Sequence, residues 1–200
     1  YEIGVRLVGS EMCIRDSGEP MAQPFDFLGI GISEIANVSE RRLERLINPQ
    51  LNDLPAFLTP QGGLNSGYMI TQYACAALVS ENKILAHPAS VDSIPSSANQ
   101  EDLVSMGTIA ARTARDILVN SVRVLATELM AACQAIDFRK DLNLKLGKGT
   151  QKAYDAVRAV TDFIKLDTDI EMYKELDKVT KLIVDGTILE AVEAAVELNY

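Results

Sequence analysis

The 200-residue chain has 28 acidic and 19 basic side chains, which gives a net charge of −9. This balance disfavours a nucleic-acid partner, because the chain has no basic stripe that could replace phosphate counterions. Hydrophobic residues make up 48% of the sequence, enough for one domain with a sizeable core, and no apolar run is long enough to cross a bilayer. No secretory signal is visible, so we expect a cytoplasmic protein.

Three widely spaced cysteines and a single histidine exclude a zinc finger and argue against a disulfide framework. We therefore expect reduced thiols and no metal site.

The segment from Leu7 to Ser17 reads LVGSEMCIRDS. It resembles a sequencing adapter translated in one frame, and a chance match of that length is improbable. We predict that residues 1–17 are a translation artefact with no part in the fold. On this interpretation the chain proper begins at Gly18, and Cys13 has no redox role.

Apolar residues recur at three- and four-residue steps through most of the remaining chain, which is the periodicity of helices. The first predicted helix covers residues 21–48, and the second is capped by Asn65 or Ser66 and ends before His87. The third and longest covers residues 108–138. Two shorter helices, marked by Tyr154 to Phe163 and by Ile170 to Ile183, and a last helix over residues 188–198 follow. Gly29 and Gly31 weaken the first of them, and Asp185-Gly186 predicts a stop. A helix over 108–138 would span about 46 Å at 1.5 Å per residue. Such a helix needs neighbours to cover it, so we predict an all-α bundle of long helices.

Two loops separate these helices and carry unusual polar sequences. Gly62 to Ile70 reads GGLNSGYMI, and Ser90 to Gly107 reads SVDSIPSSANQEDLVSMG. The first lacks the Lys-Ser/Thr that completes a P-loop, so we interpret it as a tight turn into a packed helix. In the second, Ser97 or Asn99 is expected to cap a helix whose first turn holds the acidic residues.

Three further groups have mainly structural interpretations. We expect Ser39 to Arg42, which reads SERR, to form a solvated helix face or a salt-bridge cluster between subunits. His87 is expected to be structural, and Met69, Tyr73 and Cys75 are expected to belong to the core.

The two polar loops together resemble the histidine and aromatic amino-acid ammonia-lyases, which depend on a methylidene-imidazolone group. Leu54 to Leu58 (LPAFL) and Ala132 to Lys140 (ACQAIDFRK) support the resemblance, which is strong from Gly18 to about Lys140 and then fades. It implies an all-α fold in which 18–140 is a central helical-bundle segment and 141–200 a C-terminal helical segment of such an enzyme.

The resemblance also implies a site. Glu101 would be catalytic and would bind the substrate near its amino group, with Gln100 beside it. The electrophile forms by self-cyclisation of an internal Ala-Ser-Gly, which this sequence lacks. An upstream tyrosine that acts as the base is likewise outside this chain. We therefore expect the cofactor to form in a missing upstream part, and the intact enzyme to be a homotetramer with shared active sites.

The substrate stays open at this point. Glu101 favours histidine ammonia-lyase, which converts histidine to urocanate and ammonia. Leu103 and Ala89 stand where histidine enzymes often have histidines, which leaves tyrosine or phenylalanine ammonia-lyases and 2,3-aminomutases as alternatives. A non-catalytic helical scaffold is the alternative of another class. We expect the 200-residue chain alone to be inactive and to self-associate through exposed apolar helix faces.

Overall fold

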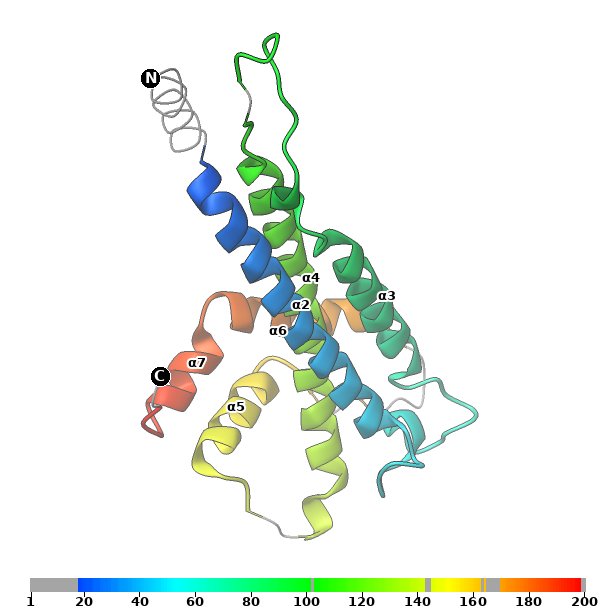
Figure 1. The fold of residues 1–200 in the computed structure, drawn as a ribbon. Helices are drawn as coiled ribbons and strands as arrows, with labels where there is room; N and C mark the ends of the chain where they lie inside the picture. The colour runs from blue at the N-terminus through cyan, green and yellow to red at the C-terminus, as the bar shows by residue number, and fades with distance from the viewer. Residues whose placement is uncertain (1–17, 102, 143–144, 163, 165–169, 199–200) are drawn as a thin grey trace. The chain divides into compact units, whose positions relative to one another are not determined.

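The computed structural model describes residues 18–101, 103–142, 145–162, 164 and 170–198. The long helices are α2 (Glu19–Ile47), α3 (Met69–Leu85) and α4 (Gly107–Phe138), followed by α5 (Lys148–Arg158), α6 (Met172–Val184) and α7 (Thr187–Glu193), as Figure 1 shows. Short 3-10 helices cover Ala56–Leu58 (η1), Ala89–Val91 (η2) and Lys140–Leu142 (η3). In this described part, β pairing is limited to two isolated bridges, Gly62 with Asn65 and Ser96 with Glu101. The predicted all-α class is confirmed.

Contacts divide the chain into two compact units. Unit 1 combines residues up to 35 with residues 79–121, and unit 2 combines residues 36–78 with residues 122–200. The predicted artefact at 1–17, including Cys13, lies outside the described residues. The predicted division at residue 140 refers to the architecture of a larger enzyme and stays a prediction. No helix within the described ranges has the length and apolar character needed to cross a membrane.

Helix α2 runs without a break through both glycines that weakened its prediction. In unit 1, a Cβ on Gly29 would lie 3.1 Å from Cδ1 of Ile117 and 3.8 Å from Cα of Ala114. Gly29 therefore lets α2 approach α4 closely, and this packing offsets the roughly 1 kcal/mol that glycine costs inside a helix. A Cβ on Gly31 would meet nothing within 4 Å.

Helix α4 has 32 residues, as its unbroken periodicity predicts. Its second half supplies much of the core of unit 2, where Val124, Ala126, Met130 and Ala131 are fully buried. The predicted core position of Tyr73 is wrong, because this side chain is 67% exposed, whereas Cys75 is buried. Position 73 faces away from the buried side of α3, which carries Cys75 and Val79.

The C-terminal helices are shorter than predicted. Helix α5 ends at Arg158, so Val160 lies beyond it, while Phe163 lies outside the described residues. Helix α7 ends at Glu193. There the hydrogen bond from Ala195 N to the Val192 carbonyl (3.0 Å) spans three residues, which is the tighter 3-10 pattern. The predicted stop before α7 is confirmed, since Gly186 has a φ of 80° that suits glycine.

Candidate functional site

The segment between η2 and α4, residues 92–106, carries Gln100 and Glu101; we call it the Glu101 loop. The prediction that Ser97 or Asn99 caps a helix here is wrong, because α4 begins only at Gly107. Ser97, Ala98 and Asn99 instead have φ values of 52°, 54° and 63°. These left-handed values cannot continue into a right-handed helix, so the chain turns back on itself.

The tip of the Glu101 loop is a small hairpin closed by Ser96 and Glu101. Ser96 N donates to the Glu101 carbonyl at 3.0 Å, and Glu101 N donates to the Ser96 carbonyl at 3.3 Å. Within the turn, Gln100 N donates to the Ser97 carbonyl at 3.1 Å. The structure thus brings Gln100 and Glu101 together at an exposed tip. The neighbouring Asp102, expected in the first turn of a helix, lies outside the described residues.

The Glu101 carboxylate has hydrogen-bond acceptor positions that another molecule could use. Its Oε2 accepts a long hydrogen bond of 3.5 Å from Oγ of Ser96. A carboxylate has about four acceptor positions, and an ammonium group is a natural donor to them. Glu101 is exposed in this chain. Its carboxylate is therefore accessible to a ligand or to another protein segment.

The base of the Glu101 loop lies against the first turns of α4. Gly107 N donates to Oγ of Ser105 at 3.1 Å, and a Cβ on Gly107 would lie 3.0 Å from the Gly18 carbonyl oxygen. A cavity of about 480 Å³ opens here; its lining is Gly18, Met21, Gly107, Thr108, Ala111, Arg112 and Arg115. Gln100 and Glu101 are not among its lining residues.

Sequence reasoning missed Arg112 and Arg115. The signal was their three-residue spacing, which places them on one side of α4. Together with the N-terminus of α4, whose macrodipole favours negative charge, they make this corner of unit 1 attractive to anions.

The Gly62–Gly67 segment is the tight turn that was predicted. Gly67 has a φ of 54°, and a Cβ there would lie 2.3 Å from the carbonyl oxygen of Phe57. That carbonyl accepts a hydrogen bond of 2.9 Å from Tyr68 N, just before α3 begins at Met69. The segment therefore fixes the entry into α3.

The structural interpretation of Ser39–Arg42 also holds within unit 2, although the expected solvated face is wrong for two of its members. Ser39 and Glu40 are buried, and Ser39 Oγ donates to Oε2 of Glu128 at 2.6 Å. Arg42 Nη2 donates to the same oxygen at 2.7 Å, and this bond raises the pKa of Arg42. Glu128 is the partner that sequence reasoning missed, because it lies 86 residues away from Arg42.

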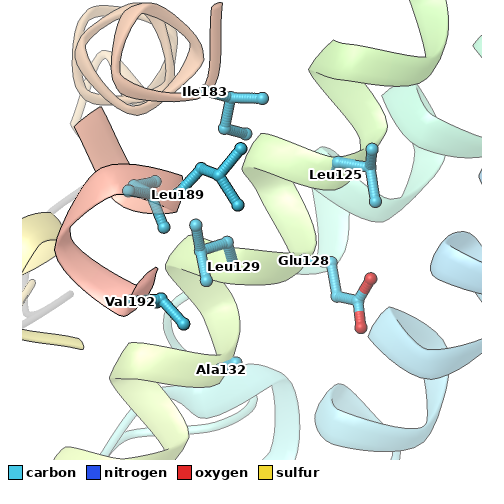
Figure 2. A pocket seen from close by; sticks show the side chains of 8 residues that line it. Leu125, Glu128, Leu129, Ala132, Ile183, Leu189 and Val192 are labelled. Carbon is cyan, nitrogen blue, oxygen red and sulfur yellow. The ribbon is translucent and has the colours of Figure 1, made fainter. Parts of the chain in front are cut away.

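A second cavity of about 430 Å³ lies in unit 2 between α4, α6 and α7 (Figure 2). Its lining is Leu125, Glu128, Leu129, Ala132, Ile183, Ile188, Leu189 and Val192. Figure 2 shows the Glu128 carboxylate turned away from the apolar side chains of α6 and α7. Since that carboxylate already bonds Ser39 and Arg42, this lining offers little to hold a polar amino acid.

His87 is exposed, lies two residues beyond the end of α3 and lines neither of these two cavities. The strongest candidate site among the described residues is therefore the Glu101 loop.

Comparison with known proteins identifies related chains. The family described as "Aromatic amino acid lyase" matches residues 17–159. The chain is 79% identical over 183 residues to a histidine ammonia-lyase of Clostridium tetani, which covers 92% of this chain and 36% of that protein. It is 66% identical over 182 residues to a histidine ammonia-lyase of Streptococcus pyogenes serotype M1, covering 91% of this chain and 35% of that one.

Solved structures give the same picture. The histidine ammonia-lyase of Trypanosoma cruzi matches with a TM-score of 0.83 and 46% identity, over 90% of this chain and 34% of that one. A tyrosine aminomutase of Streptomyces globisporus matches with a TM-score of 0.84 and 34% identity, over 91% of this chain and 34% of that one. The chain thus spans about a third of the length of the relatives it matches.

Proposed function

Because the chain belongs to the aromatic amino acid lyase family, we propose that the whole protein is a histidine ammonia-lyase that converts histidine to urocanate and ammonia. The observation that carries this proposal is the 79% identity over 183 residues to the Clostridium tetani histidine ammonia-lyase. Identity to the tyrosine aminomutase is much lower, at 34%. Tyrosine or phenylalanine substrates and aminomutase chemistry are kept as the alternative, because of Leu103 and Ala89.

In this proposal Glu101 is the catalytic and substrate-binding carboxylate, and Gln100 lies beside it to bind the substrate. The exposed carboxylate can accept charge-assisted hydrogen bonds from the substrate's ammonium or imidazole donors. Gln100 adds an amide with two donors and an acceptor at the same tip. Both are positioned by the short hairpin between Ser96 and Glu101.

The family resemblance implies a methylidene-imidazolone electrophile, and these residues do not fit its formation. The sequence has no Ala-Ser-Gly, and its Asn65-Ser66-Gly67 is committed to the turn into α3 through the close approach of Gly67 to Phe57. We therefore propose that the electrophile comes from sequence outside these 200 residues. We also propose a homotetramer in the cytoplasm, as the resemblance implies.

A chimera tests this function. Residues 18–200 would replace the matching segment of the Clostridium tetani enzyme, and urocanate formation would be followed by its absorbance. We expect turnover of histidine, and we expect Glu101→Gln to lower kcat/KM by about 10²-fold or more, a usual effect for a positioned acid or base.

Glu190→Gln, which removes an exposed charge on α7, is the matched control and should leave kcat/KM unchanged. Tyrosine and phenylalanine are assayed in parallel, and the isolated chain should show no absorbance change with any of the three amino acids. A folded chimera that is inactive on histidine, or that prefers tyrosine or phenylalanine, would overturn the proposal.

A further inference from the structure

The Glu101 loop is fastened at three levels within unit 1. At its foot, Ser90 N donates to Oδ2 of Asp26 on α2 at 2.8 Å. Halfway up, Ser93 bonds Val104, and at the tip Ser96 pairs with Glu101. The serines involved, Ser90 in η2 and Ser93 and Ser96 in the loop, recur every three residues along the arm that leads to the tip.

Asp26 provides the lowest fastening. Asp26 is a buried residue, only 7% exposed. A buried carboxylate is costly unless it accepts hydrogen bonds, and a bond from a backbone N–H to an ionised oxygen is among the stronger ones. The donor here is the backbone of Ser90 in η2, the short helix that leads into the Glu101 loop. Asp26 therefore fixes where the loop leaves the helical body of unit 1.

Ser93 provides the middle fastening with a single hydroxyl. Its Oγ accepts a hydrogen bond of 2.9 Å from Val104 N and donates one of 3.4 Å to the Val104 carbonyl oxygen. The hydroxyl thus bonds both the N–H and the carbonyl of Val104, as the backbone of a neighbouring strand would do. This bond joins the two arms of the loop eleven residues apart.

The tip needs such support because its backbone is strained. Three successive residues without glycine's freedom, Ser97, Ala98 and Asn99, are in the left-handed region. Such conformations are unfavourable for residues other than glycine and persist only when their surroundings hold them. If the two arms separated, the tip would relax, and the Glu101 carboxylate would move with it.

We propose that Asp26 and Ser93 are positioning residues that hold the Glu101 carboxylate in place for the substrate. This inference rests on the proposed function, since it assigns a role to residues that do not touch the substrate themselves. Both residues act through the backbone of the loop. Asp26 fixes the position at which the loop leaves unit 1, and Ser93 fixes the distance between the two arms of the loop.

The test uses the chimera described above, with its Ser93→Ala and Asp26→Ala variants. We expect each to lower kcat/KM for histidine by about 10–100-fold, the size of effect produced by a misplacement of about 1 Å. Ser93→Thr keeps the hydroxyl and Asp26→Asn keeps an acceptor oxygen, so both should recover most of the lost activity. Ser80→Ala removes an exposed hydroxyl from α3 and is the matched control.

A double-mutant cycle separates positioning from a general structural effect. In the Glu101→Gln background there is no carboxylate left to position, so Ser93→Ala should lower kcat/KM by less than about threefold. The same fold loss in both backgrounds would overturn the inference.

Amide hydrogen exchange provides a readout that does not depend on activity. In Ser93→Ala, the amides of Ser96 and Glu101 should exchange at least about tenfold faster than in the parent chimera, because local opening becomes easier. Unchanged exchange would overturn the inference even if activity fell. A chimera without activity would sink the proposed function alone, and the exchange of these two amides would still decide whether Ser93 holds the loop.

Discussion

Among the described residues, positive φ values in residues other than glycine occur at two places, Phe57–Leu58 and Ser97–Asn99, and the sequence predicted neither. Gly67 has a φ of 54°, which a glycine in a polar loop makes easy to predict. Phe57 and Leu58 have φ values of 55° and 54°, which their residue types do not predict. They are held by contacts distant in sequence, since the Phe57 carbonyl accepts from Tyr68 N. Ser97 to Asn99 were missed for the same reason.

Gly67→Ala should destabilise the chain strongly. The new Cβ would lie 2.3 Å from the Phe57 carbonyl oxygen, in a left-handed conformation. We expect a loss of about 3 kcal/mol or more in the free energy of unfolding, measured by urea denaturation followed by circular dichroism.

Gly63→Ala is the control for this substitution, because Gly63 has a φ of 95° but no atom within 4 Å of the new Cβ. It should cost only the conformational part, about 1–2 kcal/mol. Equal losses in the two variants would show that the contact with Phe57 does not matter.

At the level of elements, Asp137 joins the end of α4 to α5 inside unit 2. Its side chain is 3% exposed. Its Oδ1 accepts from Tyr154 Oη at 2.5 Å and from Lys140 Nζ at 2.6 Å, and its Oδ2 accepts from Arg158 Nη2 at 2.5 Å. Burial acts to raise the pKa of Asp137, but the bonds from Lys140 and Tyr154 and the charge of Arg158 outweigh it and lower the pKa.

Asp137→Asn should lower the free energy of unfolding at pH 7 by about 3 kcal/mol, because it removes the buried carboxylate that pairs with the half-buried Arg158. The pKa is lower in the folded state, so the ionised carboxylate adds its full stability above the unfolded value of about 3.9. That stability is lost as the pH falls through the folded value. Urea denaturation between pH 3 and pH 7 should therefore show the two proteins converging at the acidic end.

Asp177→Asn, on an exposed position of α6, is the control and should change stability by less than about 0.5 kcal/mol. A constant difference between the Asp137→Asn variant and its parent across the whole pH range would contradict the role given to the carboxylate.

The long helices were predictable and the Glu101 loop was not, for a physical reason. Periodicity over a helix such as α4 depends on many residues that agree, so its bounds followed from sequence. Serine and asparagine followed by acids suit a helix N-cap and a polar hairpin equally well. The choice between them depends on the bond between Ser93 and Val104, which sequence does not display. Asp137 was likewise missed as a junction, because its partners Tyr154 and Arg158 lie 17 and 21 residues later.

At the level of the whole molecule, the helices carry large apolar side chains that the chain itself leaves uncovered. On α2 in unit 1, Phe27 is 77% exposed, Leu28 50% and Ile30 41%. On α3, Ile84 is 77% exposed. Apolar surface of this extent is usually covered by other protein, and the chain spans only 36% of its Clostridium tetani relative.

We therefore expect the chain by itself to self-associate, because covering an exposed phenylalanine or isoleucine contributes about 1.5–3 kcal/mol. Replacing both Phe27 and Ile30 by lysine should shift the mass measured by light scattering towards the 21.8 kDa of one chain. Leu64→Lys is the matched control, since this residue is 80% exposed but lies in the turn before α3. The control should associate like the parent. A parent chain that gives one species of 21.8 kDa at all concentrations would mean that these helix faces are stable in water without a cover.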